Sequence, residues 1–124
     1  MSPTVLYIED NEDNVVLIQR LLRRRPHLDL AVARDGRDGL RQALAATPAL
    51  VLLDRRLPDM PGDEVLTCLK AAAATTAIPV VMVSGDAAEH GARFLESGAA
   101  DVFTKPFDIA LLLAAIDRLC PADG

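Results

Sequence analysis

Three short runs of consecutive apolar residues mark the chain: Val5–Ile8, Leu50–Leu53 and Val80–Val83. An uninterrupted apolar run of this length is typical of a strand that is buried on both faces, as in a parallel sheet. Two weaker runs, Leu28–Val32 and Ala100–Phe103, predict edge strands or strands that are less buried. The pattern therefore predicts five strands, of which the central ones are the most apolar.

The segments between these runs carry apolar residues at helical spacing. The first and last segments show the spacing best, at Val15, Ile18, Leu21 and Leu22 and at Ile109, Leu112, Leu113, Ile116 and Leu119. Residues that favour helix starts precede each segment: Asn11 and Asp13, Asp35-Gly36, Pro61-Gly62-Asp63, Asp86, and Pro106-Phe107-Asp108. The arginines before Pro26 are expected at the end of the first helix, and Gly98 at the end of the fourth.

Strands and helices thus alternate five times, which predicts a parallel sheet with helices on both faces. Right-handed crossovers leave few topologies for five strands. We expect an α/β, flavodoxin-like (βα)5 three-layer sandwich whose five-stranded parallel sheet has the order 2-1-3-4-5. The expectation is one domain over residues 1–124, with a core at about residues 4–119, a short tail over residues 120–124 and no output domain.

Composition narrows the class of protein. The chain has 124 residues, 51% of them hydrophobic and 25% charged, which is ordinary for a globular domain and excludes a disordered chain. Its net charge of −5 argues against broad binding to nucleic acid or to anionic lipid. No apolar run has the length of a membrane span, and no signal peptide is evident, so we expect a cytoplasmic protein without a membrane partner. The two cysteines, Cys68 and Cys120, are expected to be reduced.

Polar residues follow the central strands at the point where each strand is expected to end. They are Glu9-Asp10, Asp54, Ser84 and Thr104-Lys105. In an open parallel sheet, ligands bind beyond the carboxyl ends of the strands. Each residue alone also has an ordinary interpretation as a helix cap, a turn former or a solvated charge. Together they predict three carboxylates, a hydroxyl and an ammonium group in one crevice.

Three close carboxylates repel one another, so a cation is expected among them. Oxygen ligands favour Mg²⁺ or Mn²⁺, and His27 and His90 lie too far from this crevice in the sequence to indicate zinc. Lys105 supplies a second positive charge. A metal and a lysine beside a carboxylate are what a phosphoryl group needs when a carboxylate oxygen attacks it.

With these residues the sequence resembles the receiver domain of two-component response regulators, over about residues 4–119. The resemblance is carried by Glu9-Asp10, Asp54, the loop Leu57–Gly62, Ser84-Gly85 and Lys105-Pro106-Phe107. It implies that Asp54 takes a phosphoryl group from a phosphohistidine. It also implies a Mg²⁺ or Mn²⁺ site formed by Asp10 directly, by Glu9 mostly through water, by Asp54 and by the backbone carbonyl of Arg56.

The resemblance further implies that Ser84 moves toward the phosphoryl oxygens, that Lys105 contacts them, and that the Lys105-Pro106 bond is cis. The chain departs from the family at Val102, where a switching Tyr or Phe is usual; Phe103 is expected to face the other side of the sheet. Switching is therefore expected through the loops after the fourth and fifth strands.

The Arg55-Arg56 pair after the acceptor is also unusual for the family. Arg56 stands two residues after Asp54, and Asp86 two residues after Ser84. In the family these positions flank the phosphoryl group. We hypothesise that Arg56 and Asp86 pair across the site and restrict the water that hydrolyses the phosphate.

The expected phosphodonor is a sensor histidine kinase or a histidine phosphotransfer protein. Val16 is expected to point outward, either toward this donor or as an ordinary exposed residue. The fourth helix, fifth strand and fifth helix are the expected contact surface for a second copy or an output partner, with Leu111, Ala114 and Ala115 pointing outward. Direct binding to nucleic acid is not expected. The sequence of the loop after Asp54 resembles that of the receiver domains of hybrid histidine kinases.

Three other functions remain as alternatives. A pseudo-receiver would bind partners without taking phosphate. The complete set of Glu9, Asp10, Asp54, Ser84 and Lys105 argues against it, and Val102 keeps it open. An aspartate-nucleophile phosphatase of the haloacid dehalogenase type needs a second acid where Arg56 stands. A flavodoxin-like electron carrier would have its FMN phosphate repelled by the acidic segment Glu9–Asp13. The favoured interpretation is a signalling domain that catalyses only its own phosphorylation and dephosphorylation.

Overall fold

Strands and helices alternate along the computed structural model, which describes residues 2–85 and 87–121. The elements of the described residues are β1 (Thr4–Ile8), α1 (Glu12–Leu22), β2 (Asp29–Ala33), α2 (Gly36–Ala46), β3 (Leu50–Asp54), α3 (Gly62–Ala71), β4 (Val80–Ser84), α4 (Ala87–Glu96), β5 (Asp101–Thr104) and α5 (Ile109–Leu119). The predicted alternation is confirmed, and each strand lies within one residue of its predicted bounds.

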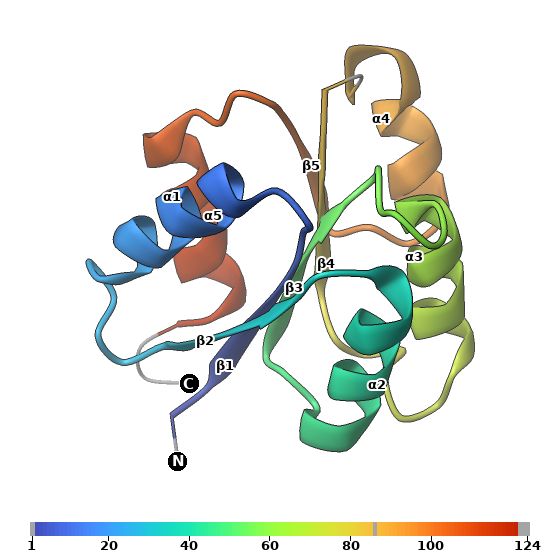
Figure 1. Ribbon diagram of the computed structural model, residues 1–124, viewed down its shortest axis with the longest axis horizontal. Helices are drawn as coiled ribbons and strands as arrows, with labels where there is room; N and C mark the ends of the chain where they lie inside the picture. The colour runs from blue at the N-terminus through green and yellow to red at the C-terminus, as the bar shows by residue number, and fades with distance from the viewer. Residues whose placement is uncertain (1, 86, 122–124) are drawn as a thin grey trace.

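The five strands form one parallel sheet in the order β2-β1-β3-β4-β5. Helices α1 and α5 cover one face of the sheet, and α2, α3 and α4 cover the other (Figure 1). Both the predicted order and the three-layer architecture are confirmed. β2 and β5 are the edge strands and are only partly buried, whereas every residue of β3 and β4 is buried.

Alternating side chains of the central strands build two separate cores, because successive residues of a strand point to opposite faces of the sheet. Val5 and Tyr7 of β1 pack on the side of α1 and α5. Leu6 and Ile8 pack on the side of α2, α3 and α4. This arrangement explains why the central runs are apolar throughout and why the polar residues stand only at their ends.

Most of the predicted helix starts are confirmed by capping contacts. Asn11, Asp35 and Asp108 are the N-caps of α1, α2 and α5, and each side chain accepts a hydrogen bond from a backbone N–H of the first turn. Gly98, with a φ of +108°, follows α4 in the left-handed conformation that glycine tolerates best. Asp86, expected to begin the fourth helix, lies outside the described residues.

Helix α5 packs largely as predicted, with Leu112, Leu113 and Ile116 buried, but two of its residues differ from the prediction. Leu111 and Ala114 are exposed as expected, but Ala115 is buried, so its predicted outward direction is wrong. Ala115 lies three residues after Leu112, which is also buried, and the two share one face. Ile109, predicted on the core face, is 40% exposed because it is the first residue of the helix.

Two further predictions concern cysteines and membranes. Cys68 on α3 is exposed, Cys120 after α5 is buried, and both are free thiols. In the part of the chain that the structure describes, no helix combines the length and the apolar character needed to cross a bilayer.

Candidate functional site

The carboxyl ends of the central strands bring the predicted polar residues to one edge of the sheet. Asp54 and Ser84 are the last residues of β3 and β4, which are neighbours in the sheet. Glu9 and Lys105 directly follow β1 and β5. Because all strands run parallel, their ends meet at the same edge, and residues far apart in sequence become neighbours.

Three carboxylates form the acidic part of the site. Oxygen atoms of Glu9, Asp10 and Asp54 all lie within 4.8 Å of one another. Glu9 and Asp54 are buried, with 1% and 5% of their surface exposed, whereas Asp10 is exposed at the rim. Lys105 offsets one of these charges when all three are ionised. The remaining negative charge and the all-oxygen donor set fit a hard divalent cation such as Mg²⁺ or Mn²⁺.

Lys105 joins the two buried carboxylates. Its Nζ lies 2.8 Å from Asp54 Oδ1 and donates a hydrogen bond over the same distance to Glu9 Oε1. Although burial alone would lower the pKa of Lys105, these two partners raise it above its ordinary value. The Lys105-Pro106 peptide bond is cis, as expected. The structure thus places a positively charged ammonium group against the predicted acceptor.

Glu9 is held by donors that the sequence analysis missed. The Tyr7 hydroxyl donates to Glu9 Oε1 at 3.0 Å, and Asn14 Nδ2 donates to the same oxygen at 2.9 Å. Burial raises the pKa of Glu9, but the hydrogen bonds from Lys105, Tyr7 and Asn14 outweigh it and lower that pKa below its ordinary value. Tyr7 stands two residues before Glu9 on the same side of β1, which was the available signal in the sequence.

The pKa of Asp54 is shifted in the opposite direction from that of Glu9. Burial and the negative charge of Glu9 raise the pKa of Asp54 to about 6, against the opposing effect of Lys105. Glu9 and Asp54 share Lys105, and Glu9 has the additional donors. Asp54 is therefore the carboxylate of the pair that is less well stabilised as an anion, and a bound cation or phosphoryl group would relieve this.

The loop between β3 and α3 begins after Asp54, the predicted acceptor, and is closed on itself. Gly62 N–H donates to Arg55 C=O at 2.7 Å, and Arg56 forms an isolated antiparallel bridge with Pro61. A Cβ at Gly62 would overlap the backbone oxygen of Asp54 and lie 2.8 Å from Arg55 Cα. Glycine is required here by this close approach of the two backbone segments.

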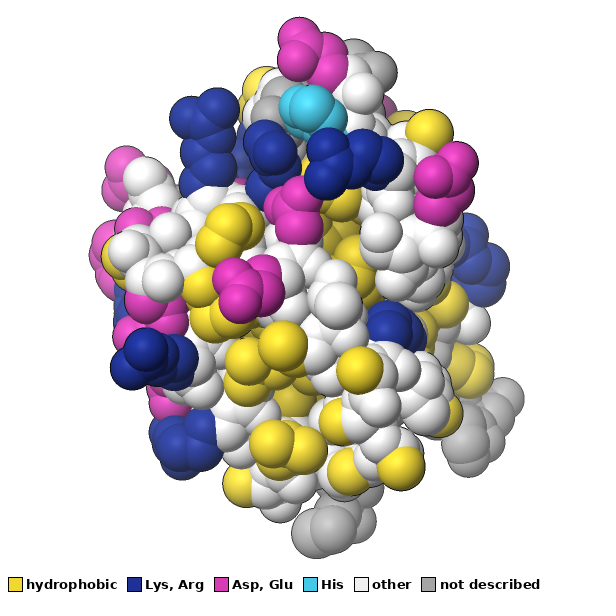
Figure 2. Space-filling model, turned by 90° about the vertical axis from the view of Figure 1, so that its right-hand side faces the viewer, with side chains coloured by type: hydrophobic (Ala, Val, Ile, Leu, Met, Phe, Trp, Pro, Cys, Tyr) yellow, Lys and Arg dark blue, Asp and Glu magenta, His cyan; other side chains and the backbone are white. Residues whose placement is uncertain are grey.

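The two arginines after Asp54, Arg55 and Arg56, differ in their surroundings. Arg55 lies over the Phe94 ring, 5.9 Å from its centroid, and its Nε is 3.3 Å from Asp63 Oδ1, whereas Arg56 is exposed. Figure 2 shows the side of the molecule that α2, α3 and α4 cover, with basic side chains gathered near one end around an acidic one. The predicted partner of Arg56, Asp86, lies outside the described residues.

Two adjacent residues of β5 point to opposite faces of the sheet. Val102 packs with the core beside α2, α3 and α4, and Phe103 packs with the core beside α1 and α5. The expectation that Phe103 faces away from the side of Val102 is confirmed. Ser84, on the neighbouring strand β4, is 2% exposed. The Ser84 hydroxyl therefore lies at the buried end of β4, between Asp54 on β3 and the end of β5.

Comparison with known proteins adds a family and relatives. The response regulator receiver domain family matches residues 5–117. Response regulator PleD of Caulobacter vibrioides is 36% identical over 120 residues, which cover 96% of this chain and 26% of PleD. Transcriptional regulatory protein HprR of Escherichia coli is 38% identical over 113 residues, or 90% of this chain and 49% of HprR. The chain therefore spans between a quarter and a half of the length of these relatives.

A solved structure matches the fold over nearly the whole chain. It is the receiver domain of sensor histidine kinase PA1611 from Pseudomonas aeruginosa PAO1, with a TM-score of 0.86 and 25% sequence identity. The match covers 96% of this chain and 98% of that one. The PA1611 domain holds a magnesium ion coordinated in its active site cleft.

Proposed function

This chain belongs to the response regulator receiver domain family, and on that premise we propose that Asp54 accepts a phosphoryl group from a phosphohistidine. The donor is a sensor histidine kinase or a histidine phosphotransfer protein. One observation carries the proposal: the Lys105 ammonium lies against Asp54 and Glu9 beside the exposed Asp10 carboxylate. Negative oxygens and a fixed cation are thereby assembled where an attacking carboxylate needs them.

In the proposed reaction an Asp54 carboxylate oxygen attacks the phosphorus in line with the bond to the histidine nitrogen. The P–N bond breaks, its electron pair stays on the imidazole, and an acyl phosphate forms on Asp54. Lys105 moves from pairing the carboxylate to pairing the phosphoryl oxygens, while Glu9 keeps it anchored. We expect the donor to approach from the side of the exposed Asp10.

The residues proposed to hold Mg²⁺ or Mn²⁺ are Asp10 directly, Glu9 mostly through water, Asp54, and the backbone carbonyl of Arg56. When bound, the metal supplies positive charge that offsets the charge of the transferring phosphoryl group. The fit rests on the all-carboxylate cluster with one exposed member. The magnesium ion of the PA1611 receiver domain supports this assignment.

Phosphorylation would add about −1.5 to −2 charges and three strong acceptors at Asp54. We propose that the Ser84 hydroxyl and Lys105 engage these oxygens and move the loops after β4 and β5, with Val102 in place of an aromatic switch. The proposed readout surface is α4, β5 and α5, where Leu111 is 58% exposed. A second copy or an output partner is its proposed occupant, and the proposal places the protein in the cytoplasm, without direct contact to nucleic acid or a membrane.

The test is intact mass after incubation with acetyl phosphate and Mg²⁺. We expect a gain of one phosphoryl group that is absent with a chelator and absent in Asp54→Asn. Asp13→Asn, which removes an exposed carboxylate of α1, is the matched control and should keep the gain. A gain that persists in Asp54→Asn contradicts the assigned acceptor.

Two further outcomes identify the alternatives. No gain from acetyl phosphate, and none from a phosphorylated histidine phosphotransfer protein, would indicate a pseudo-receiver. Steady turnover of a generic phosphate ester would instead indicate an aspartate-nucleophile phosphatase.

A further inference from the structure

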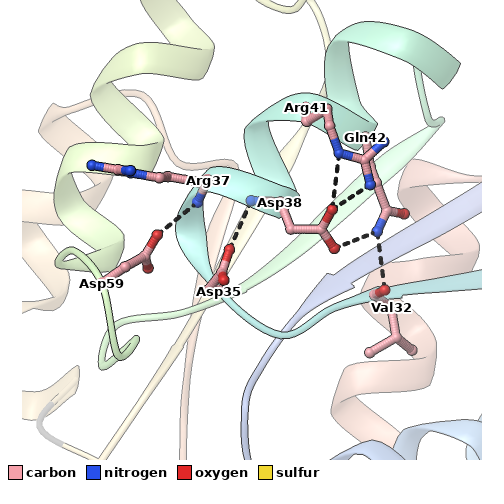
Figure 3. A network of polar contacts seen from close by, with 7 residues as sticks. All are labelled: Val32, Asp35, Arg37, Asp38, Arg41, Gln42 and Asp59. Atoms are coloured by element: carbon pink, nitrogen blue, oxygen red, sulfur yellow. Dashed lines mark hydrogen bonds and ion pairs between the residues drawn. The ribbon is translucent and has the colours of Figure 1, made fainter.

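The loop that follows the acceptor is fastened to the start of helix α2 by one carboxylate. Asp59 Oδ1 accepts a hydrogen bond from Gly36 N–H at 2.7 Å, and Asp59 Oδ2 accepts one from Arg37 N–H at 2.9 Å. Figure 3 shows Asp59 reaching from its loop to the first turn of α2. These are first-turn N–H groups, which no backbone carbonyl of the helix can satisfy. The contact therefore joins the loop that carries Arg56 to helix α2, which contributes no residue to the proposed site.

The next residue strengthens the same contact. A Cβ at Gly36 would lie 2.7 Å from Met60 Sδ, so the Met60 side chain rests directly on the glycine backbone. Met60 is also partly buried against the core on this side of the sheet. Two consecutive loop residues, Asp59 by hydrogen bonds and Met60 by packing, therefore hold the start of α2.

The two ends of the loop are bonded to each other directly after Asp54. Gly62 N–H donates to Arg55 C=O, and Arg56 bridges to Pro61. These contacts close the segment 55–62, which directly follows Asp54. Arg56 lies near the start of this segment, and Asp59 lies in its middle. The backbone of Arg56 has little freedom to move while both ends of this segment are fixed.

We infer that Asp59 is a positioning residue for the proposed metal site: by fastening the loop to α2, it fixes the backbone of Arg56, two residues after Asp54. This inference rests on the proposed function, in which the Arg56 carbonyl is a metal ligand. It implies a reciprocal effect, because linkage between two sites acts in both directions. Mg²⁺ should tighten the hydrogen bonds from Gly36 and Arg37 to Asp59.

Asp35 is a matched control at the same helix end. Its Oδ1 accepts a hydrogen bond from Asp38 N–H at 2.7 Å, within α2 itself. Asp35→Ala and Asp59→Ala each remove one negative charge and one helix-capping carboxylate from the N-terminus of α2. Only Asp59 belongs to the loop that carries Arg56. A role confined to helix capping would leave the Kd for Mg²⁺ similar in the two variants.

The experiment is a calorimetric titration of the full chain with Mg²⁺, for the wild type, Asp59→Ala, Asp59→Asn and Asp35→Ala. We expect Asp59→Ala to raise the Kd for Mg²⁺ at least about threefold above that of Asp35→Ala. Asp59→Asn, whose amide oxygen can still accept one N–H, should fall between Asp59→Ala and the wild type. A ratio below about threefold between the two alanine variants overturns the inference.

Hydrogen exchange gives a second readout, independent of phosphorylation. Mg²⁺ should slow exchange of the Gly36 and Arg37 amides in the wild type and in Asp35→Ala, but not in Asp59→Ala. Unchanged exchange in the wild type at saturating Mg²⁺ overturns the inference and leaves the proposed function intact. If the wild type binds no Mg²⁺, the proposed metal site is wrong and the inference fails with it.

Discussion

The hydroxyl of Tyr7, a residue with no exposed surface, donates a hydrogen bond of 3.0 Å to Glu9 Oε1. The Glu9 carboxylate of the candidate site is therefore held by a hydrogen bond from a residue of the hydrophobic core. Burial and the charge of Glu9 together raise the pKa of Tyr7 well above its ordinary value, so Tyr7 acts only as a neutral donor.

Tyr7→Phe should lower the free energy of unfolding by about 1 kcal/mol, because Glu9 loses one donor while the ring still fills the core. Urea unfolding measures this loss. The same substitution in a Glu9→Gln background should cost less, since a neutral amide gains less from the hydroxyl. An equal cost in both backgrounds would show that the bond to Glu9 contributes nothing specific.

Stability of the metal-free protein should depend on the ionisation of Asp54. The folded-state pKa of Asp54 is raised to about 6, whereas an unfolded Asp has a pKa of about 4. The folded state thus binds this proton more tightly, and its contribution to stability is complete below about pH 4 and lost as the pH rises through about 6. Asp54→Asn should therefore raise the melting temperature more at pH 8 than at pH 4.

The lowered pKa of Glu9 acts in the opposite direction, since its contribution is present above the unfolded pKa of Glu and lost as the pH falls through its folded value. Comparing the wild type and Asp54→Asn at each pH keeps Glu9 in both proteins. Melting curves in the presence of a chelator provide the measurement. A gain of equal size at pH 4 and pH 8 would mean that Asp54 ionises normally.

Binding of Mg²⁺ should stabilise the fold, because a ligand that binds only the native state shifts the unfolding equilibrium. At a Mg²⁺ concentration one hundred times its Kd, the gain is about 2.7 kcal/mol. Asp10→Asn should abolish the gain, whereas Asp13→Asn, which also removes an exposed negative charge nearby, should keep it. The prediction fails if Asp10→Asn melts with the same Mg²⁺ dependence as the wild type.

Two glycines should respond in opposite ways to alanine. Gly62→Ala forces a methyl group against the Asp54 and Arg55 backbone and should cost about 2 kcal/mol or more. Gly91→Ala lies within α4, where the added methyl meets Val102 Cγ1 at 3.8 Å, an ordinary contact. Higher helix propensity should then stabilise the protein by up to about 1 kcal/mol. Chemical denaturation measures the free energy of unfolding of both variants. A similar loss of stability in the two variants would contradict the close approach at Gly62.

Arg56→Ala should shorten the lifetime of the acyl phosphate on Asp54. Arg56 is exposed two residues after the acceptor, and we expect its side chain to restrict the attacking water. The decay of the phosphorylated mass after removal of acetyl phosphate measures the half-life. An unchanged or longer half-life in Arg56→Ala would contradict this role.

Much of the fold follows from the chain pattern. Apolar runs separated by helical segments predict the parallel sheet and its more exposed edge strands, and the strand order comes from the flavodoxin-like class. The bounds of β2 depend instead on pairing: it runs from Asp29 to Ala33 because these residues pair with Thr4 to Ile8 of β1. Ala115 was misplaced because alanine carries little hydrophobic signal, and its burial follows from the packing of α5.

The sequence predicts those parts of the site that depend only on where a residue stands in the chain. Glu9, Asp54 and Lys105 meet because each stands at a strand end, whatever its side-chain conformation. The bonds from Tyr7 and Asn14 to Glu9 depend on the direction of side chains, which periodicity does not define. The hold of Asp59 on α2 is a contact between distant segments and has no counterpart in the local pattern.

The contrast between the two thiols has a practical consequence. Cys68 is exposed on α3, the helix that begins where the acceptor loop closes, whereas Cys120 is buried and burial raises its pKa. A maleimide dye should therefore label Cys68 selectively, without any engineered cysteine. Because the chain has no tryptophan, such a dye would be its main optical reporter. The native protein thus carries an attachment point from which events at Asp54 can be followed in real time.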